Sequence, residues 1–412
     1  MLLFMMFELI KISLVLILIL ILIRKKLGIG YVMLIASAAL FLLYGMDAEH
    51  IAATIEKTLV NGVTLKLLLA LSLIRIFELI LREKNILVAM MSTAKVLFRK
   101  RRAIIISMPL LIGMLPSLGG AYFSAPMVKE ATSGMQMSQE EKAFINYWFR
   151  HPWEFILPLY PGILLASAVS NIPLYNIIKA NMGYAVTLLA TGFLFAMKGV
   201  DKDPHKAQAE HAEDKMAGKT ASKKDLASFL PIVIVLALVV FVHIELHYAL
   251  LATIVPLFFL FRYRSADIIR ITRYGFALEV IILIFGIMLF KESMDSSGAV
   301  RNLSSFFIQQ NIPFLPVICI LPFVIGLMTG LTVGFVGSTF PLLISMTGGA
   351  SLAHISLAFS AGFIGVLLSP VHLCLVLTKE YFKADLWGIY KKILPASAII
   401  FIAALLEYTF LN

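Results

Sequence analysis

Residues 104–127 read IIISMPLLIGMLPSLGGAYFSAPM, and residues 317–342 read VICILPFVIGLMTGLTVGFVGSTFPL. The second segment is a degenerate copy of the first, with Pro109 falling on Pro322, 213 residues later. The match extends beyond both segments, so one half of the chain duplicates the other. Each half therefore carries one apolar segment that Gly, Pro, Ser or Thr breaks at the same place. In a membrane protein this pattern indicates a transporter and its substrate site.

The composition predicts a membrane protein. Hydrophobic residues make up 60% of the 412 residues, charged residues only 14%, and the mean hydropathy is +0.93. A soluble chain has roughly a quarter of its residues charged. The two cysteines, Cys319 and Cys374, lie in apolar segments and predict neither a disulfide framework nor a metal site. The net charge of +11 comes from loops that are rich in Lys and Arg, so the expected partner is a lipid bilayer and not a nucleic acid.

Ten apolar stretches are long enough to cross a bilayer as helices. They are expected at about 7–23, 28–45, 60–81, 143–171, 174–197, 226–245, 248–261, 275–291, 352–378 and 386–411. Two shorter hairpins are expected at 103–133 and 314–347, because their halves are too short to cross alone and each turns at Gly with Pro or Thr. Such re-entrant backbone is tolerated at membrane depth where it is buried in protein or lines a cavity.

The basic residues are distributed unevenly over the loops. With the N-terminus outside, 27 of the 35 Lys and Arg lie in predicted cytoplasmic loops, six lie outside, and Arg75 and Arg150 lie within spans. The positive-inside rule therefore places both termini outside the plasma membrane. Five spans in each half, an odd number, make residues 1–198 and 226–412 two inverted repeats. The polar segment 199–225 is expected to be a cytoplasmic linker between them.

The hairpin tips are the first candidate substrate site. A broken helix offers free N–H groups to anions and free carbonyl groups to cations, glycine lets the backbone approach a ligand, and hydroxyl groups bind either. The residues expected to bind substrate are Ser117, Gly119, Gly120, Ser124, Thr332, Gly334, Gly337, Ser338 and Thr339, and Pro116 is expected to break the first hairpin. The alternative is that these small residues serve close helix packing.

The helix predicted at 143–171 carries ionisable residues below the cytoplasmic surface. Arg150 is expected to bind an anion, and His151 and Glu154 to carry protons, because ionisable groups inside a membrane are costly and tend to be functional. The alternative is that Arg150 and Glu154, four residues apart on one helix face, neutralise each other. The residues expected to break this helix are Pro158, Pro161 and Gly162.

The helix predicted at 352–378 holds the matching site of the second half. Pro370 falls on Pro158 at an offset of 212 and is expected to break this helix too. His372, two residues later, is the equivalent of Tyr160 and is a third candidate proton carrier. A histidine that is simply hydrogen-bonded in the core is the alternative. Arg75 with Glu78 is expected to be a structural pair in an earlier span.

Three segments resemble an uncharacterised prokaryotic integral-membrane family, domain of unknown function 401: MLPSLGGAYFSAPM (114–127), NYWFRHPWEFILPLYPG (146–162) and GLTVGFVGSTFPLL (330–343). The resemblance covers essentially the whole chain. That family is in turn similar to the ion transporter superfamily of carboxylate, gluconate, citrate, arsenite and Na⁺/H⁺ carriers. The resemblance implies inverted repeats, a central site at the hairpin tips and helix breaks, and a homodimer. The tips lack the Ser-Asn-Thr sequence typical of sodium-coupled dicarboxylate carriers, so neither dicarboxylate specificity nor sodium coupling follows.

The expected fold is an all-α polytopic membrane protein. The expected function is secondary active transport of a small, carboxylate-like organic anion, coupled to H⁺ or Na⁺ and without another cofactor. One alternative is a cation/proton antiporter with Glu154 and His151 as the relay. Another is a lipid-phosphate translocase with Arg150 on the phosphate. A membrane enzyme is not expected, because the sequence shows no catalytic triad, zinc signature, phosphate loop or dinucleotide fingerprint.

Overall fold

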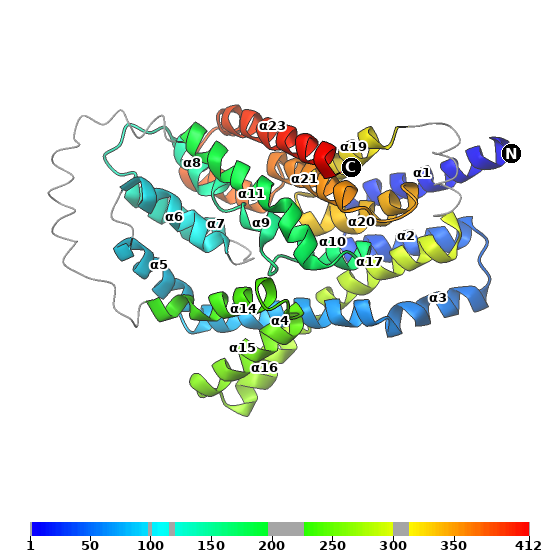
Figure 1. The fold of residues 1–412 in the computed structure, drawn as a ribbon, viewed down its shortest axis with the longest axis horizontal. Coiled ribbons are helices and arrows are strands. Elements are labelled where there is room, and N and C mark those ends of the chain that lie inside the picture. The colour runs from blue at the N-terminus through cyan, green and yellow to red at the C-terminus, as the bar shows by residue number, and fades with distance from the viewer. Residues whose placement is uncertain (1, 98–100, 115–119, 197–225, 300–312, 412) are drawn as a thin grey trace.

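The computed structural model describes residues 2–97, 101–114, 120–196, 226–299 and 313–411, and these residues form helices joined by short turns (Figure 1). The described elements are α1 (Leu2–Arg24), α2 (Ile29–Leu43), α3 (Ala48–Val60), α4 (Gly62–Glu83), α5 (Ile86–Leu97), α6 (Arg101–Gly113), α7 (Gly120–Ala131), α8 (Gln139–Trp148), α9 (Trp153–Ile156), α10 (Pro161–Ser170), α11 (Leu174–Ala196), the 3₁₀ turn η2 (Ala227–Phe229), α14 (Leu230–Val240), α15 (Leu246–Leu260), α16 (Ser265–Gly275), α17 (Leu278–Ser296), α19 (Phe314–Thr329), α20 (Thr332–Met346), α21 (Leu352–Leu368), α22 (Leu373–Phe382) and α23 (Leu386–Leu411). The prediction of an all-α fold is confirmed.

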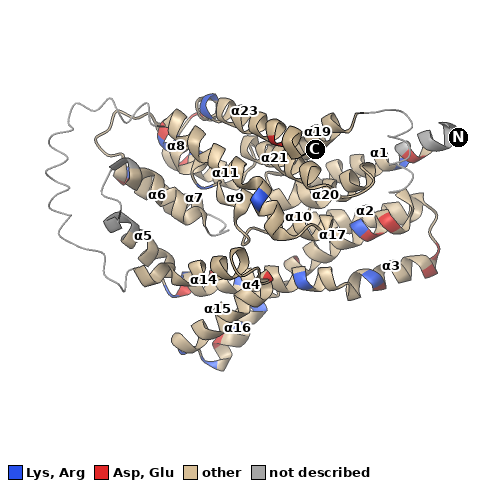
Figure 2. Ribbon diagram, in the orientation of Figure 1, with Lys and Arg blue, Asp and Glu red and all other residues tan. Residues whose placement is uncertain are grey.

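Five helical runs are long and apolar enough to cross a membrane, judged by length and composition. They are Gln139–Ser170, Leu174–Ala196, Ser265–Ser296, Leu352–Phe382 and Leu386–Leu411, and shorter apolar helices accompany them. Large apolar side chains also cover the outside of the bundle, including Leu42, Phe241 and Phe410. Charged residues are scattered singly or in small groups along the ribbons (Figure 2). The chain is therefore a polytopic membrane protein.

Several predicted spans differ from the described helices. The spans expected at 28–45 and 226–245 correspond to the shorter helices α2 and α14. The span expected at 60–81 begins at Asn61, whose side chain accepts a hydrogen bond from the Val63 N–H at 2.8 Å and so caps α4. α4 also carries Lys66, Arg75, Glu78 and Arg82, and these charges exclude it from the helices that are apolar enough to count as spans. α4 itself has 22 residues, as many as the expected span, so its charges and not its length set it apart from the five apolar runs.

The limbs of each predicted hairpin pack against each other, α6 on α7 and α19 on α20. α7 packs against α22, and α20 packs against α10. On the other side of the bundle α2 packs against α17, and α15 packs against α4 (Figure 1). These contacts between the halves come in pairs: α7 on α22 corresponds to α20 on α10, and α2 on α17 corresponds to α15 on α4. The inverted repeat, with its boundaries at 198 and 226, stays a prediction, and the linker at 199–225 lies outside the described residues.

Small residues bring two of these helices to backbone contact. A Cβ atom on Gly326 of α19 would overlap the carbonyl oxygen of Gly362 in α21, and one on Gly365 would overlap the carbonyl oxygen of Phe323. Close approach through small residues is a common mode of helix packing in membranes. It joins the first limb of the second hairpin firmly to the helix that ends at the second break.

Candidate functional site

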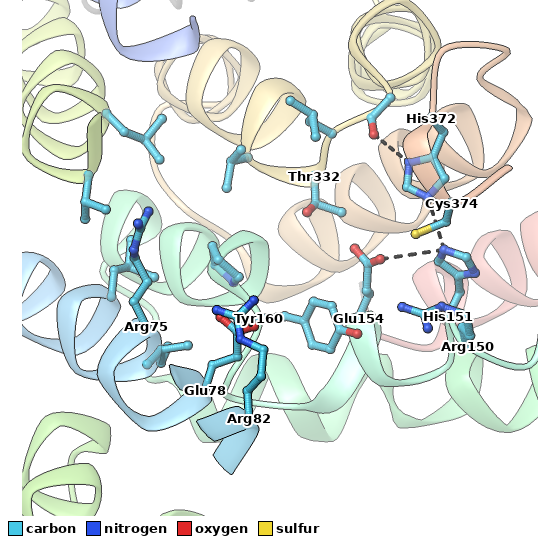
Figure 3. Close-up of a pocket in the computed structure, with 18 of the residues that line it drawn as sticks. Arg75, Glu78, Arg82, Arg150, His151, Glu154, Tyr160, Thr332, His372 and Cys374 are labelled. Atoms are coloured by element: carbon cyan, nitrogen blue, oxygen red, sulfur yellow. Dashed lines mark hydrogen bonds and ion pairs between the residues drawn. The ribbon is translucent and has the colours of Figure 1, made fainter. Parts of the chain in front are cut away.

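A cavity of about 410 Å³ lies where α4, α16 and α17 face the helix breaks and the tip of the second hairpin (Figure 3). Its walls come from distant parts of the sequence. Its lining is Leu71, Ile74, Arg75, Glu78, Arg82, Arg150, His151, Glu154, Tyr160, Pro161, Tyr274, Val280, Leu283, Gly330, Leu331, Thr332, Val333, His372 and Cys374. A volume of this size suits a small molecule.

The first wall is built around a double interruption of the first broken helix. α8 ends at Trp148, α9 begins at Trp153, and α10 begins only at Pro161. Pro152 has no N–H to continue a helix and disfavours the helical conformation of the residue before it. The break expected near Pro158 is present between Leu157 and Tyr160, and the earlier interruption at 149–152 was not predicted.

Helix breaks leave carbonyl groups without a partner along the chain, and inside a bilayer no water can satisfy them. At the end of α6, side chains from other elements donate hydrogen bonds to these carbonyl groups. Trp153 donates its Nε1–H to the Leu110 carbonyl oxygen at 2.6 Å, and the Tyr160 hydroxyl donates to the Gly113 carbonyl oxygen at 2.5 Å. A Cβ atom on Gly113 would overlap the Arg150 carbonyl oxygen, so glycine is needed for this close approach.

The break between α21 and α22 is satisfied in the same way. α21 ends at Leu368, just before Pro370, and the helix resumes at Leu373. The Tyr147 hydroxyl donates to the Leu367 carbonyl oxygen at 2.9 Å, and the Tyr390 hydroxyl donates to that of Leu368 at 2.8 Å. The broken helix of one half thus caps the broken helix of the other.

The tip of the second hairpin lies against this second break. Gly330 ends α19 in the left-handed conformation (φ 62°), and Leu331 leads directly into α20. The carbonyl oxygen of Gly330 lies 2.7 Å from Nδ1 of His372 and accepts its hydrogen. Thr332, the next residue after the turn, faces the cavity and packs against Gly162 of α10.

Two histidines meet between the breaks (Figure 3). Nε2 of His151 lies 3.1 Å from Nε2 of His372, and Nδ1 of His151 lies 2.6 Å from the Tyr147 carbonyl oxygen. The Glu154 carboxylate approaches His151 Nε2 to 3.9 Å. Cys374 completes the cluster, because its Sγ and one ring nitrogen of each histidine all lie within 4.8 Å of one another.

Arg150 is 4% exposed and points a guanidinium group at this cavity. Its Nε and Nη1 atoms have no hydrogen-bond partner within the described parts of the chain. No ion pair joins it to Glu154 in these parts, so the neutralising pair considered from the sequence does not form. The reason is local: the helix ends at Trp148 before either residue, and the spacing of four then no longer places them on one helix face.

The opposite wall carries a second charged group on α4. Arg82 Nη2 lies 3.8 Å from a Glu78 oxygen and donates to the Tyr274 hydroxyl at 3.3 Å. The Arg75 guanidinium stacks over the Tyr274 ring at 4.7 Å, where the ring face attracts the cation. The structural pair expected at Arg75 with Glu78 is therefore formed by Arg82 instead, since Arg75 turns to the ring.

The structure brings part of the predicted site together. Arg150, His151, Glu154, Pro161, Thr332 and His372 line the cavity. The other described candidates do not line it: Gly120, Ser124, Pro158, Gly162, Gly334, Gly337, Ser338, Thr339 and Pro370. Pro116, Ser117 and Gly119 lie outside the described residues.

The buried hydroxyl groups of the hairpins have local partners. Ser338 donates to the Gly334 carbonyl oxygen at 2.7 Å, and Thr339 donates to that of Phe335 at 2.7 Å. Ser124 bonds back to Gly120 in the same manner at 3.3 Å. These hydrogen bonds satisfy each hydroxyl within its own helix, which is the packing role considered as the alternative.

Sequence reasoning missed three cavity residues. Tyr160 is predicted only as the equivalent of His372, Cys374 lies in an apolar segment that predicts no metal site, and Arg82 is not among the predicted site residues. The spacing of His372 and Cys374, two residues apart after Pro370, was an available signal. Their link to His151 was not, because it joins positions more than 200 residues apart.

The chain belongs to a family described as "Protein of unknown function (DUF401)", whose model matches residues 7–411. This match confirms the family resemblance read from the three motifs. No curated protein matches the chain significantly.

Proposed function

We propose that this member of the uncharacterised family is a secondary active transporter, not an enzyme, and that it carries a small carboxylate-like anion by alternating access coupled to H⁺ or Na⁺. The observation that carries the proposal is the buried Arg150 guanidinium with unpartnered nitrogens at the cavity. A buried charge without a partner is costly, whereas a carboxylate offers the planar pair of acceptors that a guanidinium binds best.

The charges around the cavity support an anionic ligand. Arg75, Arg82 and Arg150 supply three positive charges, and Glu78 and Glu154 supply at most two negative ones. The lining is otherwise mostly apolar, so the few polar groups act in a low dielectric where each has more effect. An anion that enters would restore balance at Arg150.

The walls of the cavity suggest which parts move. Both helix breaks and the second hairpin tip meet at His151 and His372: their Nε2 atoms lie 3.1 Å apart, and His372 donates a hydrogen bond to the Gly330 carbonyl oxygen. α4 on the opposite wall contributes its own charged group. We propose that the breaks and hairpins move together against α4 and α17, which opens the cavity to each side in turn.

A cation/proton antiporter is the second candidate. It is favoured by the contact of Glu154 with His151 and of His151 with His372, since chains of Glu and His in membranes are typical proton relays. Proton flux on a Na⁺ pulse in the absence of any anion distinguishes this function. A lipid-phosphate translocase would use Arg150 for the phosphate and is distinguished by transport of a labelled phospholipid.

The test uses purified full-length protein in proteoliposomes. A thermal-shift screen of carboxylates, with phosphate as a comparison, is followed by uptake of the hits under a pH or Na⁺ gradient. We expect a carboxylate to stabilise the protein and to be taken up, and Arg150→Gln to weaken its binding by more than tenfold. Arg273→Gln, an exposed arginine on α16, is the matched control and leaves binding unchanged. No carboxylate effect, or an unaffected Arg150→Gln, contradicts the proposal.

Topology and assembly extend the proposal. We propose a homodimer in the plasma membrane with both termini outside and residues 199–225 in the cytoplasm. Labelling of single cysteines placed at either terminus in sealed cells tests the orientation, in a Cys319→Ser, Cys374→Ser background. Mass determination in nanodiscs tests the dimer.

A further inference from the structure

The hydrogen bonds of His151 and His372 determine where their hydrogens are. Nδ1 of His151 lies 2.6 Å from the Tyr147 carbonyl oxygen, and Nδ1 of His372 lies 2.7 Å from that of Gly330. A carbonyl oxygen only accepts, so each Nδ1 carries a hydrogen. A neutral imidazole has one N–H, and both Nε2 atoms therefore present lone pairs.

These two lone pairs face each other at 3.1 Å in a buried site, with His151 2% and His372 7% exposed. Two acceptors at this distance repel unless a cation lies between them. The cation is either a shared proton or a metal ion. The arrangement in which each histidine gives its other N–H to a backbone carbonyl is the one that holds metal-binding histidines in place.

The third group decides between the two cations. A proton needs only the two nitrogens, but the Cys374 sulfur also reaches the cluster, within 4.8 Å of the ring nitrogens. We propose that His151, His372 and Cys374 form a binding site for one transition-metal ion of the Zn²⁺ type. Two imidazole nitrogens and a thiolate are the ligands that such ions prefer.

The distances require only a small adjustment. Nitrogens bound to a tetrahedral Zn²⁺ lie about 3.3 Å apart, close to the 3.1 Å between the two Nε2 atoms. A sulfur bound to the same ion lies about 3.5 Å from each nitrogen. The Cys374 sulfur now lies within 4.8 Å of them, so it has to move closer by about 1 Å at most. Figure 3 shows the sulfur beside the gap between the two rings.

Charge and coordination number also fit. The thiolate and the nearby Glu154 carboxylate supply two negative charges, which offset the dication beside Arg150. Three protein ligands leave the fourth position of a tetrahedral ion open, as in sites that bind a further ligand. Thr332 and Tyr160 line the same cavity, so the open position is accessible to a water molecule or a small anion.

The bound ion would join three separate elements. His151 belongs to the first break, His372 and Cys374 belong to the second, and His372 also holds the tip of the second hairpin through Gly330. In the proposed transporter, on which this consequence rests, the bound ion therefore holds the two helix breaks and the hairpin tip together at the substrate site. We expect micromolar Zn²⁺ to stabilise the protein and to slow anion exchange.

The test measures the metal alone, so it does not depend on any transport activity. Full-length protein in detergent is stripped with EDTA and titrated with Co²⁺, and bound Zn²⁺ is counted by mass spectrometry after dialysis. We expect one ion per chain and the absorption bands of tetrahedral Co²⁺ with a thiolate ligand. Cys374→Ser removes the thiolate band, and both His151→Asn and His372→Asn weaken binding by more than tenfold.

Asparagine is chosen because its amide N–H reaches the carbonyl that Nδ1 serves, which preserves the local hydrogen bond while removing the ligand. Cys319→Ser and His354→Ala, which lie outside the cluster, are the matched controls and keep full binding. Less than stoichiometric binding, or binding that survives Cys374→Ser together with His372→Asn, overturns the proposal and leaves a shared proton between the rings. Anion transport measured in EDTA remains a separate test of the proposed function.

Discussion

Tyr160 and His372, 212 residues apart, each donate a hydrogen bond to the end of a hairpin's first limb. The Tyr160 hydroxyl donates to the Gly113 carbonyl oxygen at the end of α6, and His372 Nδ1 donates to the Gly330 carbonyl oxygen at the end of α19. Each donor is the last residue of a helix break, directly before the helix resumes, and serves the first limb of a hairpin. The equivalence that the sequence offset predicts thus coincides with an equivalent role.

Tyr160→Phe removes one donor from this pair of contacts. The Gly113 carbonyl oxygen stays buried beside the Arg150 backbone and loses its partner, which costs about 1–3 kcal/mol. We expect a lower thermal midpoint in detergent, measured by intrinsic fluorescence. Tyr31→Phe, at an exposed tyrosine of α2, is the control and leaves the midpoint unchanged. Equal midpoints for the two variants contradict this role of the hydroxyl.

Two variants of His372 distinguish the contribution of its hydrogen bond from that of its side-chain volume. His372→Ala leaves the Gly330 carbonyl oxygen unpaired, and we expect a loss of about 1–3 kcal/mol. His372→Asn places an amide N–H near the position of Nδ1 and should recover most of that loss. Thermal unfolding of the two variants in the presence of EDTA makes the comparison independent of any metal ion. If asparagine is as destabilising as alanine, the hydrogen bond is not the main contribution of His372.

Gly330 is predicted to be intolerant of any side chain. Gly330→Ala places a Cβ atom on a residue with φ of 62° and 2.9 Å from the Cα atom of His372. Gly45→Ala is a close control, because Gly45 has φ of 61° and no atom within 4 Å of a Cβ. Both variants bear the cost of a left-handed residue, about 1 kcal/mol, and only Gly330→Ala adds the overlap. We expect Gly330→Ala to have a clearly lower thermal midpoint than Gly45→Ala. Similar midpoints for the two variants would show that the tip of the second hairpin is not fixed against His372.

Ser356 links α21 to α11 through buried hydrogen bonds. Its hydroxyl lies 3.0 Å from Asn181 Oδ1 and 3.0 Å from the Tyr184 hydroxyl. Ser356→Ala removes the partner of Asn181 Oδ1 and one of the partners of the Tyr184 hydroxyl, and we expect a loss of about 1–2 kcal/mol. Ser360, one turn later and equally buried, has no partner for its hydroxyl within the described residues, so Ser360→Ala should be neutral or stabilising. The opposite order of thermal midpoints would contradict this assignment.

The helix breaks were predictable because their causes are local. Pro158 and Pro370 lack an N–H and constrain the residues before them, and both lie at breaks in the structure. The break at 149–152 was missed because Arg150 and Glu154 were placed on one continuous helix. Apolar composition located the helices well but not their ends: α4 has the 22 residues expected for a span, and the cap at Asn61 places its start.

The candidate site was only partly predictable. Arg150, His151 and Glu154 stand out because charge in an apolar segment is costly, whatever the fold. The hydroxyl of Ser338 looked equally suitable, but it turns to its own helix, and no local pattern reports that orientation. His151 and Cys374 come together only because the two halves of the chain pack against each other. A single sequence carries no information about that packing.

The helix ends that side chains cap are places where the bundle can be altered one contact at a time. Bending an intact helix in lipid breaks backbone hydrogen bonds that nothing replaces, whereas the carbonyl groups at these ends are each served by one side-chain donor, such as Trp153, Tyr147 or Tyr390. A point substitution at one of these donors therefore loosens one contact and leaves every helix intact. Evolution can therefore adjust how firmly each break is held without redesigning the helical framework.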